Sequence, residues 1–161
     1  MTDLMKSVMN AIMTIWLKSW GTGRDPMPVG RPWWLRDDAG VTGESALEEA
    51  WFSGKRRVWI APGDVLVYYA VGHQYVFAIA EVVGRPYTRR DGSAWPLRLP
   101  VRLLFTVPDI LDGVHLPSLP MPSGKRYQDA IRQKAYVEIK DPRDYGTIVA
   151  AIAEHLEGAG P

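Results

Sequence analysis

Residues 62–87 constrain the fold of this chain more than any other stretch. An apolar run at 65–71 follows a Pro-Gly-Asp turn, and a second apolar run at 75–83 follows a reversal at Gly72-His73. Two such runs joined by a short reversal predict a β-hairpin. Side chains on both faces of the second arm are apolar. Because neither face is polar, we expect the hairpin inside a barrel or a sandwich, where both faces of a strand are covered.

The composition favours one β-rich domain. The chain has 161 residues, of which 47% are hydrophobic, and this is enough for a single domain with a proper core. Thirteen prolines and fifteen glycines interrupt short apolar runs, which favours a β-rich fold over an all-helical one. The chain has no cysteine, which excludes disulfides, cysteine nucleophiles and thiolate metal sites. We therefore expect a cytoplasmic protein.

A set of residues in and around the hairpin matches the pattern of a known family. These residues are Gly63-Asp64, Tyr69, Ala78–Val83 and Tyr87 in the hairpin, Trp33-Trp34-Leu35 before it, and Trp95-Pro96 leading into Leu97–Phe105 after it. The pattern resembles EVE domains, which are PUA-like relatives of the YTH and ASCH domains. Two departures are visible. Lys55–Trp59 stands where the family has Trp-x-Gly-Val-Arg-Asn, and Ala70-Val71 stands where it has His-Ser.

The resemblance implies a fold and a function. The fold is α+β, with a PUA-like β-barrel of about five to six strands and small flanking helices. The function is that of a non-enzymatic module that binds DNA or RNA and reads a modified base, such as a modified cytosine. The resemblance places the family's opening-strand tryptophan at Trp34 and its hairpin tyrosine at Tyr69, and Tyr87 closes the matching segment.

Aromatic residues are in excess independently of the resemblance. Seven tryptophans and seven tyrosines exceed what a core of this size needs, and their flat rings are suited to stacking on bases. For each ring, packing in the core is the competing interpretation. The candidate base-binding residues are Trp33, Trp34, Trp59, Tyr69, Tyr87 and Trp95.

Positive charge is concentrated in the middle of the chain. Residues 55–107 contain eight Lys or Arg and three Asp or Glu, although the net charge of the whole chain is only +1. Two interpretations stay open: a surface that contacts phosphates, and ordinary solvated faces beside apolar strands. The candidate phosphate-binding residues are Lys55, Arg56, Arg57, Arg85, Arg89 and Arg90.

The N-terminal segment predicts a separate element. Residues 1–20 place large apolar side chains at spacings of one, three and four, which predicts an amphipathic helix with Lys18 on its polar face. This run is too short and too polar to span a membrane, so we expect no membrane partner. The helix could dock on the domain, on a partner protein or on a second copy in a homodimer. Residues 21–30 are expected to form a linker, and 31–158 the EVE/PUA-like domain.

Several further elements are expected along the chain. A capping-box spacing at Ser45 and Glu48 predicts a short helix that ends near Phe52. The remaining expected elements are a short strand at 58–60, a strand at 97–105, a helix at 125–134, a strand at 135–139, and a helix that begins near Asp141 and stops at Gly158.

No catalytic, cofactor or metal motif is found in the sequence. The three histidines lack partners at ligand spacing, and no nucleophile elbow, phosphate-binding loop or zinc-protease motif occurs. We therefore expect no enzyme activity and no cofactor. Glu81 keeps an alternative open, since a carboxylate in an apolar strand could serve a small nucleotide-directed hydrolase or transferase, although an ion pair with an arginine is favoured. A structural or oligomerisation domain with a filled barrel is the third alternative.

Overall fold

The computed structural model describes residues 13–35, 43–90, 92 and 94–158. The described residues form an eight-stranded sheet with the order β2-β6-β4-β3-β1-β8, in which β5 also pairs with β6 and β7 with β4. The strands are β1 (Ile15–Trp20), β2 (Glu49–Phe52), β3 (Val65–Ala70), β4 (Tyr75–Val82), β5 (Tyr87–Thr88), β6 (Leu97–Thr106), β7 (Val114–His115) and β8 (Tyr136–Glu138). The helices are η1 (Glu44–Leu47), η2 (Ile110–Asp112), η3 (Leu116–Ser118), α2 (Tyr127–Ala130) and α3 (Pro142–Gly158).

The predicted hairpin is confirmed and lies at the centre of the sheet. Strands β3 and β4 pair antiparallel, with Val65 opposite Glu81 and Ala70 opposite Tyr75. All six residues of β3 are buried, as expected for a strand with two apolar faces. The reversal between the arms uses positive φ angles at Gly72 (88°) and Gln74 (68°).

The helix expected over residues 1–20 is wrong for the part that the structure describes. Residues 15–20 form strand β1, which pairs parallel with β3 and antiparallel with β8. The same large side chains fit a strand because the alternation at 15–20 puts apolar groups on both faces. Residues 1–12 lie outside the described part of the chain. The segment 21–30, expected to be a linker, contributes Met27 to the core at 3% exposure.

The other expected elements are partly confirmed. Strand β6, strand β8 and helix α3 lie where the sequence predicts them. The helix expected to end near Phe52 is wrong. Only the short η1 forms before residue 48, and residues 49–52 are strand β2, which pairs with β6. The helix expected at 125–134 is only the four-residue α2, and 58–60 forms no strand.

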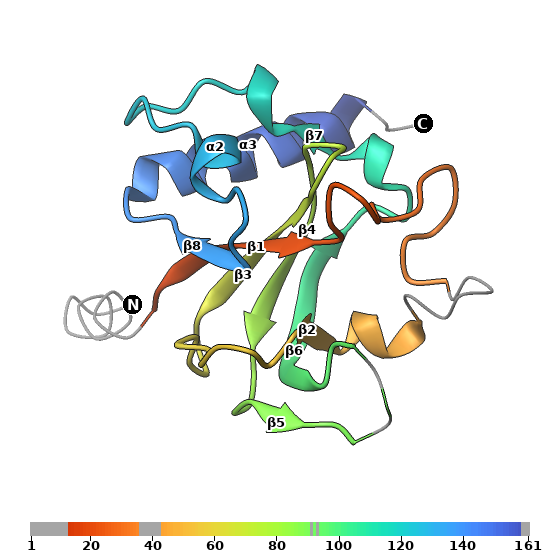
Figure 1. Cartoon of the computed structure of the whole chain (residues 1–161). Coiled ribbons are helices and arrows are strands. Elements are labelled where there is room, and N and C mark those ends of the chain that lie inside the picture. The colour runs from red at the N-terminus through yellow and green to blue at the C-terminus, as the bar shows by residue number, and fades with distance from the viewer. Residues whose placement is uncertain (1–12, 36–42, 91, 93, 159–161) are drawn as a thin grey trace.

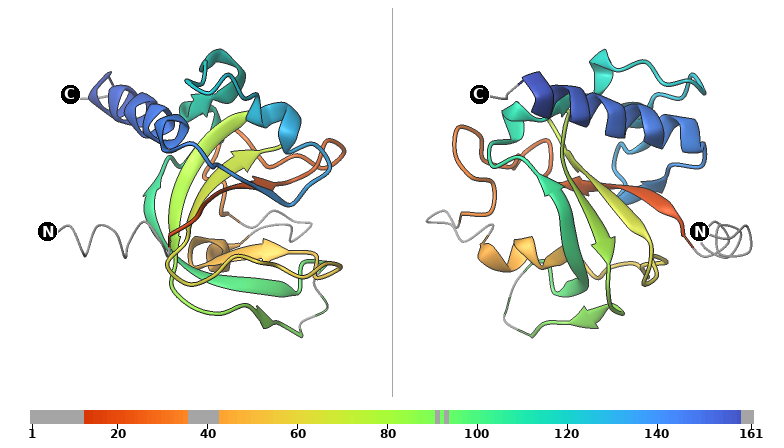
Figure 2. Two further views of the ribbon diagram at one scale, coloured as in Figure 1. Left: turned by 90° about the vertical axis from the view of Figure 1, so that its left-hand side faces the viewer. Right: turned by 180° about the vertical axis from the view of Figure 1, so that it is seen from behind.

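The sheet curls into a half-barrel (Figures 1 and 2). Its buried apolar side chains form two layers, an inner and an outer one. The inner layer contains Trp20, Trp33, Trp51 and Tyr68 together with the other residues of the larger core cluster. The outer layer lies under α2 and α3, where Ile148 packs in the same cluster as the β-strand side chains. The protein is therefore mostly β, a small barrel-like α+β fold in which the two helices cover the outer face.

Asp64 fixes the start of β1 against the turn before β3. Its buried carboxylate accepts hydrogen bonds from the backbone N–H of Thr14 (3.0 Å), from Trp16 Nε1 (2.9 Å) and from the backbone N–H of Ala61 (2.9 Å). These bonds satisfy a carboxylate that is only 3% exposed. The Gly63-Asp64 pair singled out in the sequence thus has a structural role in joining two neighbouring strands.

Candidate ligand-binding cavity

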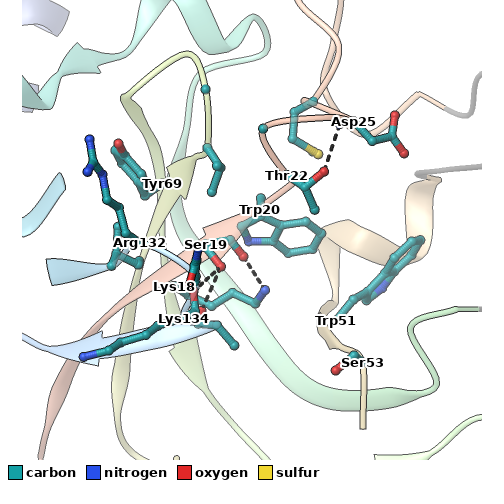
Figure 3. A pocket seen from close by; sticks show the side chains of 18 of the residues that line it. Lys18, Ser19, Trp20, Thr22, Asp25, Trp51, Ser53, Tyr69, Arg132 and Lys134 are labelled. Atoms are coloured by element: carbon teal, nitrogen blue, oxygen red, sulfur yellow. Dashed lines mark hydrogen bonds between the residues drawn. The ribbon is translucent and has the colours of Figure 1, made fainter. Parts of the chain in front are cut away.

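A cavity of about 810 Å³ lies between the two ends of the curled sheet. Its lining comes from the end of β1, the turn that follows it, the end of β2 and the segment 128–135 (Figure 3). Strands β1 and β2 stand far apart in the strand order. The curl of the sheet brings their side chains together, so the cavity depends on the whole fold.

Aromatic rings form much of the cavity wall. The aromatic lining residues are Trp20, Trp51, Phe52, Tyr69 and Trp95. The ring centroids of Trp20 and Trp51 are 6.1 Å apart, with 46° between the ring planes. Trp20 also packs against the buried ring of Tyr68 at 5.1 Å. Flat rings that are held in place by other rings present a firm surface on which a planar ligand can stack.

Arg98 holds two of these walls in position. It is 2% exposed, and its guanidinium carbon lies 4.1 Å from the centroid of the Trp51 ring. Its Nε donates a hydrogen bond to the backbone carbonyl of Trp95 (2.7 Å), and its Nη1 lies 3.1 Å from Glu49 Oε2. One planar, paired cation therefore connects the Trp51 ring to the backbone of Trp95.

Lys18 is the buried cation of the cavity. It lies in β1 between Trp16 and Trp20, and it is 4% exposed. Its Nζ donates a hydrogen bond to the backbone carbonyl of Ser19 at 2.5 Å, close to the Trp20 ring (Figure 3). It lies 4.7 Å from the centroid of the Trp20 ring and 4.5 Å from that of the Phe52 ring. Burial lowers the pKa of Lys18 from 10.5 to about 7. This amine is therefore partly neutral near neutral pH.

The structure brings only some of the expected aromatic residues to the cavity. Tyr69 and Trp95 line it. The other four lie elsewhere. Trp33 is fully buried in the core and donates from Nε1 to Thr106 Oγ1, and Trp34 packs edge-on against it at 5.8 Å. Trp59 is 66% exposed, and the guanidinium of Arg57 stacks on its ring. The hydroxyl of Tyr87 donates a hydrogen bond to Glu49 Oε1.

The candidate phosphate-binding residues form two exposed groups. The first group, Lys55–Arg57, begins two residues after Ser53, which lines the cavity and accepts a hydrogen bond from the backbone N–H of Lys55. The second group, Arg85, Arg89 and Arg90, flanks the short strand β5, and Arg89 lies 4.0 Å from Glu49. The first group therefore follows the cavity wall closely along the chain, whereas the second flanks the strand that pairs with the start of β6 and reaches Glu49 on β2.

The sites considered for enzyme or metal chemistry are occupied by structural contacts. Glu81 is not among the cavity-lining residues, and it pairs with Arg102 on the surface of the sheet at 2.5 Å. His73 Nε2 lies 2.9 Å from the carbonyl of Met27, and His115 Nδ1 lies 2.6 Å from Ser118 Oγ. Within the described ranges, no cluster of three or more His, Asp or Glu side chains could hold a metal ion. In the same ranges, every helix is too short or too polar to cross a membrane.

Sequence reasoning missed the residues that matter most to the cavity. Lys18 was expected on the solvent face of a helix, and Trp20 and Trp51 were assigned to helices. The missed signal is the period of two in IWLKSW, which puts Trp16, Lys18 and Trp20 on one face of a strand. A lysine between two tryptophans on an inward face would have indicated a polar group inside an aromatic site.

Comparisons with known proteins leave the family open. No family model matches the chain, and no curated protein matches it. Among solved structures, the chain is similar to the NMR structure of Rpa0253 from Rhodopseudomonas palustris, a structural genomics target. The two chains are 13% identical with a TM-score of 0.49, and the match covers 88% of this chain and 94% of that one. A likeness at this level identifies neither a family nor an activity.

Proposed function

We propose that the protein is a PUA-like, EVE-type module that binds a modified base of single-stranded or locally unpaired nucleic acid in the aromatic cavity. The observation that carries this proposal is the cavity itself. Its volume of about 810 Å³ is within the range of about 300–1,000 Å³ typical of small-molecule sites, and several of its walls are indole rings. The likeness of the central hairpin to EVE domains supports the same function.

The polar groups around the cavity support a nucleic-acid ligand over an uncharged one. Lys18, Arg132 and Lys134 line the cavity, and Lys55–Arg57 continue from its edge at Ser53. A base stacked on the rings would place its phosphates near these cations, since backbone contacts from Lys and Arg accompany stacking in single-strand binding. A small module without a groove-reading helix requires the base to leave the duplex.

The test compares two tryptophans that differ in position. Trp95 lines the cavity and is half-buried, whereas Trp59 is exposed on the loop after β2 and does not line it. Binding is measured by fluorescence anisotropy on a panel of single-stranded oligonucleotides with modified and unmodified cytosine. Losing one stacked base contact costs on the order of 1–3 kcal/mol, so Trp95→Ala should weaken binding roughly ten- to a hundredfold.

Trp59→Ala is the control outside the cavity. The Trp59 ring packs against Arg57, so its loss should affect the affinity only through that cation and much less than Trp95→Ala does. A thermal melt of both variants shows whether each one keeps its fold. If Trp59→Ala weakens binding while Trp95→Ala does not, the exposed loop is the binding surface and the cavity proposal is wrong. If no oligonucleotide of the panel binds, the nucleic-acid function is wrong.

A further inference from the structure

Lys18 is a buried cation that no carboxylate of the described residues pairs with. Among the residues that the structure describes, no carboxylate oxygen lies within 4.0 Å of its Nζ. Within the same residues, its Nζ donates a hydrogen bond to the backbone carbonyl of Ser19 and to no side chain. Buried lysines are usually paired, because an isolated ammonium group is expensive to desolvate. The site therefore lacks one negative charge.

The elements around Lys18 do not supply that charge. Its register partners are Tyr68 on β3 and Tyr136 on β8, and both are phenols rather than acids. On β2 it faces the ring of Phe52. The charged groups that share the cavity lining are Asp25, Arg132 and Lys134, and the nearby pair of Arg98 and Glu49 neutralises itself. With Lys18 protonated, the lining has three basic groups and one acidic group.

Two cavity walls also contain hydrogen-bond donors without acceptors. In the described part of the chain, the Nε1 atoms of Trp20 and Trp51 are buried and have no hydrogen-bond partner. An unsatisfied buried donor costs stability, and such atoms in a folded protein require an explanation. Lys18 and these two indoles are all donors. Lys18, whose side chain lines the cavity, is the donor that a ligand meets there, so a ligand with an acceptor group is the complement of this end of the cavity.

We propose that the base recognised in the cavity carries a carboxylate, which pairs with Lys18. This inference rests on the proposed function, because it assigns the ligand class of the same cavity. The ammonium of Lys18 and the carboxylate form an ion pair between aromatic walls, and the uncompensated charge of each partner is removed. A base with an uncharged methyl group at the same position fills the cavity but leaves Lys18 unpaired.

The experiment measures binding by isothermal titration calorimetry at pH 6 and pH 8. The probes are two single-stranded oligonucleotides that differ at one base, 5-carboxylcytosine or 5-methylcytosine, and free orotate, a pyrimidine carboxylate without a backbone. Charged hydrogen bonds of this kind correspond to a preference on the order of 10–100-fold for the carboxylated base. Lys18→Met keeps the length of the side chain without its charge, and Lys140→Met, an exposed lysine outside the cavity lining, is the control.

The proposal predicts that the preference is large at pH 6 and smaller at pH 8, because Lys18 with a pKa of about 7 loses its proton between them. Binding at pH 8 should take up a proton, seen as a heat that depends on the buffer. Lys18→Met should abolish the preference and the proton uptake, and Lys140→Met should keep both.

Equal binding of both oligonucleotides overturns the carboxylate inference and leaves the proposed function intact. If orotate binds, if this binding needs Lys18, and if neither oligonucleotide binds, the carboxylate site is supported and the nucleic-acid function is wrong. If none of the three probes binds, both proposals are wrong.

Discussion

Lys18 shows how a single residue can be costly for the fold and useful for a site. Its ammonium is desolvated among the rings of Trp20 and Phe52, and burial lowers its pKa to about 7. The folded protein therefore resists protonation of this amine, while the unfolded chain protonates it up to about its ordinary pKa of 10.5. A lysine that no described carboxylate pairs with costs stability at this position, which is the cost that the proposed ligand would remove.

The pH dependence of stability tests the environment of Lys18. Between pH 7 and pH 10 the unfolded state binds more protons at this site than the folded state, so stability should rise with pH by up to about 1.4 kcal/mol per unit. Lys18→Met should be more stable than the wild type at pH 6, and the difference should shrink by pH 9. Urea denaturation of both proteins at the two pH values measures this. A difference that does not depend on pH would mean that Lys18 is not desolvated.

Strands β1 and β2 are the elements that make the cavity, and they are the elements that the sequence misplaced. The hairpin, β6, β8 and α3 could be predicted, because their periodicity and turn residues agree. The segment 15–20 could not, because a short run of large apolar residues fits a helix or a buried strand equally well. Its parallel pairing with β3 is a contact between residues 50 positions apart, which no local pattern encodes.

The same limit applies to β2 and to the site. The predicted capping box is wrong: Gly43, not Ser45, is the N-cap of η1, no described side chain caps it, and Glu48 is its C-cap. Pairing with β6 then overrides helix propensity at 49–52. Of the candidate base-binding residues, Tyr69 was found from the hairpin and Trp95 from its position before β6. Trp20 and Trp51 depend on the curl of the sheet, so their convergence was not visible in the sequence.

Substitution at Leu17 tests whether β1 belongs to the core. Leu17 is fully buried in the outer layer, whereas Met13, just before the strand, is 37% exposed. Leu17→Ala should lower the free energy of unfolding by about 2–5 kcal/mol, because it removes buried methyl groups and leaves a cavity. Met13→Ala is the control and should cost far less. Chemical denaturation measures both, and an equal, small effect would show that β1 is peripheral.

At the scale of the whole molecule, the curl of the sheet couples its two ends. The ring of Trp20 on β1 packs against the ring of Trp51 on β2. The ring of Phe52 on β2 packs against that of Tyr136 on β8, with the ring centroids 6.0 Å apart. In the strand order, β2 and β8 are the two ends, so these contacts join the ends through side chains. The curl that brings the two ends of the sheet together is visible in Figure 2. A ligand in the cavity would contact both ends at once, and we therefore expect binding to raise the melting temperature.

The distribution of charge predicts how salt affects binding. If Lys55–Arg57 contact phosphates beside the cavity, the double variant Arg56→Ala/Arg57→Ala should reduce the slope of log Kd against log salt. For single strands the reduction is about 0.7 per lost contact. Arg143→Ala on α3, where Arg143 pairs with Asp141 at 2.7 Å, is the control and should keep the slope. A slope unchanged in the double variant would assign these arginines to ordinary solvated surface.

The most direct measurement is an NMR titration of the indole N–H signals with the tightest-binding oligonucleotide of the panel. The seven tryptophans give one such signal each, and single Trp→Phe variants assign them. A base stacked in the cavity should shift the signals of Trp20, Trp51 and Trp95 most, because these three indoles line it, and should leave Trp34 unchanged. Shifts confined to the exposed Trp59, with the three cavity signals unmoved, would contradict the account.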